Sequence, residues 1–105
     1  MIAEFQNINE VLMHNFVKSR DIIALDYTNG EKSQKNTFRQ LSHQVYTIVN
    51  YLMTDGIADG DRTVVWMPNS PEQVWVDLGA TLSGAVVTPL PMETDAADAL
   101  WVIND

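Results

Sequence analysis

Apolar residues recur at spacings of three and four in three parts of the chain, which predicts three amphipathic helices. The first runs from Asn7 to about Arg20, the second opens at Thr37, and the third follows Thr94-Asp95, a good helix cap. The second pattern is the clearest, and its apolar face consists of Phe38, Leu41, Val45, Ile48, Val49 and Leu52.

Polar residues at the helix boundaries support this division. Asn7 with Glu10 resembles a capping box, and Thr37 with Gln40 matches one, because each pair can satisfy free backbone N–H groups of the first turn. Gly56 stands where the second helix should end, at a position that favours a left-handed backbone.

Two short, continuous apolar runs, residues 63–67 and 85–89, are typical of strands buried on both faces of a parallel sheet. Between them Ser70 can cap a helix, with Pro71 in its first position and Gln73 closing the box. Residues 74–82 are apolar on almost every side, so we expect this helix to be deeply buried. Strand, helix and strand form a βαβ unit, whose crossover we expect to be right-handed.

The segment between the first two helices reads as a β-hairpin. Residues 22–27 suit a strand, Asn29-Gly30 is a favoured turn pair, and residues 31–36 form either a short return strand or a loop. The fold class is therefore α/β: a small layered unit, residues 1–105, with an N-terminal helix, a hairpin and a parallel strand pair. Two strands cannot cover an all-apolar helix, so more chain or another molecule should cover it.

Charge and composition exclude several classes of function. The chain has 105 residues, 46% of them hydrophobic, and a formal net charge of −8 that falls entirely in the half after residue 54. Such a surface repels phosphate backbones, so we expect no nucleic-acid partner. There is no cysteine, no apolar run long enough to span a membrane and no secretory leader, which favours a cytoplasmic location.

An ordered set of six motifs begins at residue 37. The first three are a Thr-aromatic helix start, a helix ending in Leu-x-x-x-Gly and a Gly-Asp-Arg turn. The last three are a Pro-Asn-Ser-Pro-Glu helix start, a Gly-Ala strand ending in Pro, and a final Thr. In this sequence they are Thr37-Phe38-Arg39-Gln40-Leu41, Leu52-Met53-Thr54-Asp55-Gly56, Gly60-Asp61-Arg62, Pro68-Asn69-Ser70-Pro71-Glu72, Gly84-Ala85-Val86-Val87-Thr88-Pro89 and Thr94. The set resembles the N-terminal part of the adenylate-forming (AMP-binding) superfamily, which includes acyl-CoA synthetases. Residues 7–28 resemble that family's first helix and Ala-Leu strand more loosely, here Ala24-Leu25.

The resemblance implies a parent enzyme that activates a carboxylic acid with ATP and passes the acyl group to coenzyme A. Fatty acids are the default substrate because they are a common choice in the family. The family's phosphate loop, its acidic residues for magnesium and ribose, and its catalytic lysine all lie beyond residue 105. Residues 81–84 are the only string that hints at such a loop, and they lack its second Gly and its Lys. We therefore assign no catalytic, cofactor-binding or metal-binding residue here, and expect an inactive scaffold segment whose main partner is the remainder of the parent chain.

Several residues could be assigned a chemical role that we do not favour. The histidines are isolated and do not suggest a metal site, and the aspartates suit turns better than a cation site. The serine suits a helix cap better than a nucleophile, the arginine suits a structural ion pair better than a phosphate contact, and the tryptophans suit a core better than an acyl pocket. These residues are His14 and His43, Asp55, Asp59 and Asp61, Ser70, Arg62, and Trp66, Trp75 and Trp101.

Two other functions remain open at this point: a stand-alone protein-interaction module derived from the same family, and a small α/β ligand-binding domain. The apolar helix of residues 74–82 beside two buried-type strands also predicts that the chain self-associates, as a homo-oligomer, through exposed apolar surface.

Overall fold

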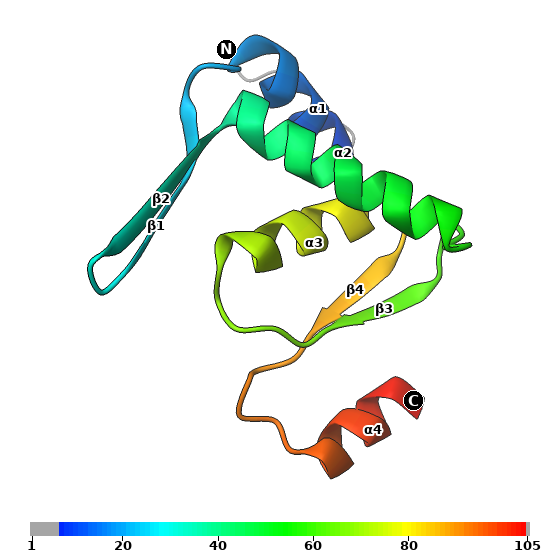
Figure 1. The fold of residues 1–105 in the computed structure, drawn as a ribbon. Helices are drawn as coiled ribbons and strands as arrows, with labels where there is room; N and C mark the ends of the chain where they lie inside the picture. Colours follow the sequence, from blue (N-terminus) through cyan, green and yellow to red (C-terminus); the bar gives the residue numbers. More distant parts are fainter. Residues whose placement is uncertain (1–6, 105) are drawn as a thin grey trace.

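The structure, a computed structural model, describes residues 7–104. Helices and strands follow one another as Figure 1 shows, in the order α1 (Ile8–Lys18), β1 (Ile23–Asn29), β2 (Lys32–Thr37), α2 (Phe38–Thr54), β3 (Arg62–Val65), α3 (Pro71–Leu82), β4 (Val86–Pro89) and α4 (Ala96–Asn104). Strands β1 and β2 form an antiparallel hairpin, and β3 and β4 form a parallel pair. The predicted α/β class and the parallel pair are confirmed.

The predicted helix starts are confirmed by their caps, whereas α1 ends at Lys18, short of the predicted Arg20. Asn7 accepts a hydrogen bond from the backbone N–H of Glu10, and Thr37 and Gln40 form the complete capping box of α2. Gly56 follows α2 with a positive φ of 97°, as expected for a residue that ends a helix. At α4, the Asp95 side chain accepts a hydrogen bond from Asp98 N.

The structure of the hairpin decides between a return strand and a loop after residue 30, and it shifts the predicted turn by one residue. Residues 32–37 are a return strand, and Asn29 pairs with Lys32 as the last residue of β1. The two-residue turn is therefore Gly30-Glu31, one position later than the predicted Asn29-Gly30. Gly30 has a φ of 63° and stands first in the turn, where a left-handed residue is needed.

Helix α3 lies between α2 and the parallel pair, whose register aligns Arg62 with Val86 and Val65 with Pro89 (Figure 1). Gly79 is buried where α3 meets α2: a Cβ built on it would stand 2.5 Å from Ile48 Cγ2. A glycine at this position lets the two helix backbones approach closely.

The main hydrophobic cluster joins α1 and α2 through the buried side chains of Phe16, Leu41 and Val45. Residues of α3 and the first strand pack against it while remaining partly exposed, among them Trp75 and Leu78. The rings of Phe16 and Tyr46 meet edge to face with centroids 5.8 Å apart.

Three expectations about burial are wrong for this chain. Strand β3 ends at Val65, so Trp66 and Met67 lie outside it, and in β3 and β4 only Val65 is buried. Helix α3 is mostly half-buried. Trp66 and Trp101 are 41% and 69% exposed and do not pack in a core. These positions carry core-type residues, but nothing in the described part of the chain covers them.

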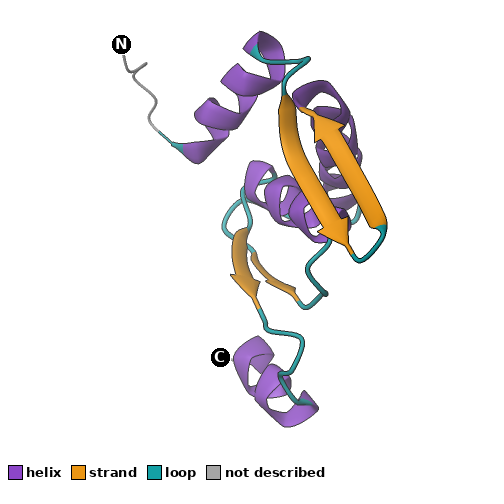
Figure 2. Ribbon diagram, turned by 90° about the vertical axis from the view of Figure 1, so that its left-hand side faces the viewer, coloured by secondary structure: helices purple, strands orange, loops and turns teal. Residues whose placement is uncertain are grey.

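Helix α4 lies at the far end of the structure, beyond the parallel pair, in both views (Figures 1 and 2). It follows a connection that includes Leu90 and Pro91, and its largest apolar side chains are exposed.

Candidate functional site

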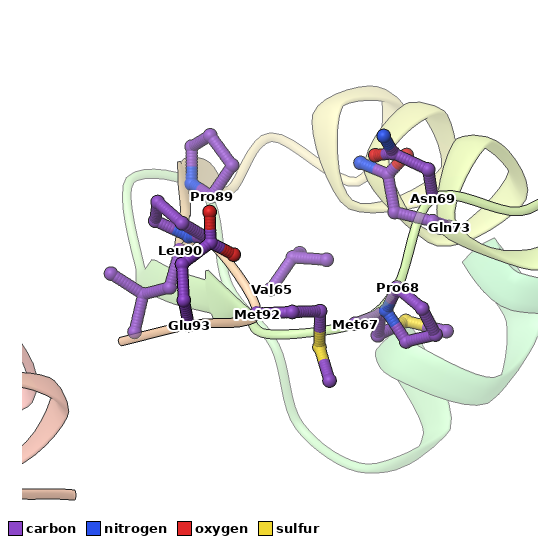
Figure 3. A pocket seen from close by; sticks show the side chains of 10 residues that line it. Val65, Met67, Pro68, Asn69, Gln73, Pro89, Leu90, Met92 and Glu93 are labelled. Carbon is purple, nitrogen blue, oxygen red and sulfur yellow. The ribbon is translucent and has the colours of Figure 1, made fainter. Parts of the chain in front are cut away.

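A concavity of about 520 Å³ lies at the carboxyl ends of the parallel strands (Figure 3). We call it the strand-end concavity; it is lined by Val65, Met67, Pro68, Asn69, Gln73, Pro89, Leu90, Pro91, Met92 and Glu93. Ligands of open α/β sheets bind outside the carboxyl ends of the strands, so this is the place where the fold favours a site.

The backbone explains why the concavity opens here. Leu90 N donates to Val65 O over 2.9 Å, which adds one hydrogen bond beyond the last residue pair of the sheet. After that point the two chain segments separate, one toward α3 and the other toward α4 (Figure 1). Pro68 and Pro91 lie in these segments, and neither can donate a backbone hydrogen bond that would prolong the sheet.

The chemistry of the concavity is mainly apolar with a few hydrogen-bonding groups. Its ionisable or amide side chains are Asn69, Gln73 and Glu93, and no Lys, Arg or His lines it. Two amides and a carboxylate can orient a largely apolar group by hydrogen bonds. A carboxylate without a neighbouring cation repels phosphate, so these residues do not bind a nucleotide's phosphates by themselves.

Ser70 borders this site but acts as a cap. Its hydroxyl accepts a hydrogen bond from Gln73 N and donates one to Pro68 O, both over 3.1 Å. The hydroxyl is therefore engaged in holding the start of α3, and the predicted capping role is confirmed.

The other candidates do not converge on the concavity. His14 and His43 are exposed on α1 and α2. The Asp61 carboxylate accepts a hydrogen bond from Ala58 N over 2.8 Å, which is the turn chemistry expected of it. Within residues 7–104, no group of three or more His, Cys, Asp and Glu side chains is placed to hold a metal ion.

The remaining predicted residues lie at element ends or in helix packing. Arg62 opens β3, opposite Val86. Trp75 is the tryptophan that packs against the core, and its indole N–H donates to Asn36 Oδ1 over 3.2 Å. Residues 81–84 end α3: the hydroxyls of Thr81 and Ser83 donate to carbonyls one turn earlier, so the string is no phosphate loop.

Sequence reasoning missed the concavity itself. Its walls come from the Met67–Asn69 loop, from Gln73 and from the segment after β4, stretches that the sequence identified only as strand ends and caps. The usable signal was topological: two parallel strands, each followed by proline, end at the same edge. In the described part of the chain, no helix combines the length and the hydropathy needed to cross a bilayer.

Comparisons with known proteins agree on one family. The AMP-binding enzyme family matches residues 12–105. The chain is 35% identical over 69 residues to the acetyl-coenzyme A synthetase of Bacillus subtilis, an alignment that spans 65% of this chain and 12% of that enzyme. It is 36% identical over 69 residues to a 3-hydroxybenzoate/4-hydroxybenzoate–CoA ligase of Thauera aromatica, covering 66% of this chain and 13% of the ligase.

Solved structures show the same fold. The N-terminal domain of FACL13 from Mycobacterium tuberculosis superposes with a TM-score of 0.82 at 27% identity, over 94% of this chain and 25% of that one. A fatty acid AMP ligase from Legionella pneumophila superposes with a TM-score of 0.88 at 19% identity, over 96% of this chain and 18% of the other. The segment thus has the fold of the N-terminal domains of adenylate-forming enzymes and spans about a tenth of the length of its first curated relatives. With most of its length matched, the chain belongs to the AMP-binding enzyme family.

Proposed function

We propose that this chain is the N-terminal scaffold of an ATP-dependent, AMP-forming carboxylate–CoA ligase and is inactive by itself. The observation that carries the proposal is the family match over residues 12–105, on a βαβ unit whose caps and turns occupy the motif positions. The remainder of the parent enzyme is the partner that we propose for the exposed apolar surface, in the cytoplasm.

The cofactors of such an enzyme do not fit the residues described here. ATP and magnesium need phosphate-binding donors and a cluster of acidic ligands. The strand-end concavity has no cationic side chain, and residues 7–104 hold no metal-type cluster. We therefore propose that ATP, magnesium and coenzyme A bind to other parts of the parent enzyme.

The carboxylic-acid substrate that we propose is a fatty acid. The names of the relatives mention several kinds of acyl group. These names mention acetyl-coenzyme A, hydroxybenzoates, and medium-chain and long-chain fatty acids. We expect the reading frame downstream of residue 105 to encode a Ser/Thr/Gly-rich loop that ends in Pro-Lys-Gly. Assaying the protein encoded by the whole reading frame with acids of these classes tests whether a fatty acid is the substrate. A reading frame that lacks the Ser/Thr/Gly-rich loop would refute the proposed parent enzyme.

The 105-residue chain should neither adenylate an acid nor bind the substrates tightly. Pyrophosphate release in the presence of ATP, magnesium and palmitate should equal the background, and calorimetric titration with ATP and with an acyl-CoA should be flat. Measurable heat that saturates with either ligand would favour the alternative of a small α/β ligand-binding domain.

A hybrid enzyme tests the scaffold role directly. We expect the Bacillus subtilis synthetase to retain ATP-dependent acetyl-CoA formation, at a reduced rate, when its segment equivalent to residues 12–105 is replaced by those residues of this chain. The matched control carries Gly79→Leu within the exchanged segment, which should abolish activity by disrupting the packing of α3 on α2. A hybrid that melts cooperatively yet forms no acetyl-CoA would contradict the proposed role.

A second candidate function, a stand-alone interaction module, is favoured by one specific observation. Leu100, Trp101 and Ile103 on α4 are each more than half exposed. Apolar groups gathered on one short helix mark a protein contact. The partner would then be another protein and not the remainder of a ligase, and an intact reading frame without downstream ligase sequence would support this alternative.

A further inference from the structure

The β1–β2 hairpin makes two hydrogen bonds to the segment that contains α3 and the loop before it. At the base of the hairpin, the indole N–H of Trp75 donates to Oδ1 of Asn36, and Asn36 is only 8% exposed. Farther along β1, the hydroxyl of Tyr27 donates to the backbone carbonyl of Asn69 over 3.0 Å. The second bond joins residues 42 positions apart and reaches the loop between β3 and α3.

Between the hairpin and the start of α3 lies a separate hollow of about 390 Å³. Its walls come from Tyr27, Asn29 and residues 32–34 on one side and from residues 70–72 on the other. Figure 2 shows the hairpin running beside the helices, with its turn at the far end from the α1 connection. Beside this hollow, the Tyr27 hydroxyl joins the hairpin to the loop before α3 by a hydrogen bond.

The peptide that Tyr27 contacts is also part of the wall of the strand-end concavity. Asn69 lines that concavity together with Gln73, and both lie on its α3 side (Figure 3). The preceding carbonyl, of Pro68, is held from within the loop by Ser70 Oγ. The Asn69 carbonyl, by contrast, is held from another element, so the hairpin adds a contact to this peptide that the α3 cap does not make.

We infer that Tyr27 is a positioning residue for the strand-end concavity: through its hydroxyl, the β1–β2 hairpin fixes the Asn69–Ser70 peptide and the wall that Asn69 forms. Nothing in the caps or in the parallel pair supplies this connection. Its relevance to a bound acid rests on the proposed function. The effect of Tyr27 on the shape of the concavity is independent of that function and can be measured on the 105-residue chain.

The test uses methionine methyl groups as reporters. Met67 and Met92 line the concavity, whereas Met13 and Met53 lie on α1 and α2. In a chain labelled with methyl-¹³C methionine, Tyr27→Phe should shift the Met67 and Met92 signals and the Asn69 and Ser70 backbone resonances, and leave Met53 in place. A hydrogen bond of ordinary strength changes the population of an opened loop about fivefold, enough to move or broaden these signals.

Tyr51→Phe is the matched control, because it makes the same chemical change, loss of a tyrosine hydroxyl, at a residue on α2 that is 68% exposed. It should leave all four methyl signals unchanged. Unaltered Met67, Met92 and Asn69 signals in Tyr27→Phe would overturn the inference. A general loss of the folded spectrum would overturn it too, because Tyr27 would then stabilise the whole fold. Activity of the hybrid synthetase is measured separately, so failure of the proposed function leaves this result untouched.

Discussion

Substituting Gly79 with leucine should lower the free energy of unfolding by about 3 kcal/mol, near the upper end of what overpacking a core commonly costs. Gly79 is buried on α3, and a Cβ there would meet Ile48 Cγ2 at 2.5 Å, Ile48 Cβ at 2.7 Å and the carbonyl oxygen of Val45 at 3.3 Å. The β-branched Ile48 side chain has few rotamers in a helix, and the Val45 carbonyl is backbone. The two helices must therefore separate. Urea denaturation followed by far-ultraviolet circular dichroism measures the loss.

Gly79→Ala gives the sharper test because two effects of opposite sign compete. Alanine is favoured over glycine inside a helix by about 1 kcal/mol, which would stabilise the chain. Steric overlap with Ile48 costs about 1–3 kcal/mol, so we expect net destabilisation. In an Ile48→Ala background the Cγ2 atom is gone, and the same substitution should cost less, by a coupling energy of at least about 0.5 kcal/mol.

Gly56→Ala is the control for adding a methyl group without a neighbour. No atom lies within 4 Å of the Cβ that it would introduce, but φ is +97°. Its cost of about 1–2 kcal/mol comes from the backbone alone and should be the same in the Ile48→Ala background. If Gly79→Ala stabilised the protein, the close approach of α2 and α3 would be refuted.

The features that could be predicted from the sequence are local ones. The caps made by Asn7, Thr37 and Ser70 each depend on a hydrogen bond to a residue three positions away, so nearby sequence suffices to identify them. The hairpin turn was placed one residue early because Asn29-Gly30 suits a turn in isolation, whereas the pairing of Asn29 with Lys32 sets the register.

Burial and the site depend on what lies far away in the chain, or outside the described residues. Trp66 has the character of a core residue, yet it is exposed because no segment of residues 7–104 covers that edge. The strand-end concavity joins the loop at Asn69 to Met92 and Glu93, more than twenty positions later, and only the parallel pairing brings them together. The contact of Tyr27 with Asn69 has no local signature at all.

The isolated chain should self-associate at micromolar concentrations through the exposed side chains of Leu100, Trp101 and Ile103, here called the α4 face. Replacing two of these side chains by glutamine should weaken association about thirtyfold. Leu100, Trp101 and Ile103 are 58%, 69% and 57% exposed. A tryptophan at the centre of an interface commonly contributes 2 kcal/mol or more, which corresponds to that factor. The double variant Leu100→Gln/Trp101→Gln keeps the net charge of −8, so any change reflects apolar contact alone. Sedimentation velocity over a range of concentrations measures the dissociation constant.

The matched control is Tyr51→Gln/Met53→Gln on α2, where the two side chains are 68% and 61% exposed. It removes similar apolar surface from another element and should leave the dissociation constant unchanged. Added salt gives an independent check. Copies that each carry −8 repel one another, so screening should strengthen an apolar association and would weaken one held by ion pairs. A constant monomer mass across the micromolar range, at low and high salt, would show that the α4 face drives no contact between copies. The stand-alone interaction module would then lose the exposed-surface argument in its favour, because that face would have failed to bind even the apolar surface of a second copy.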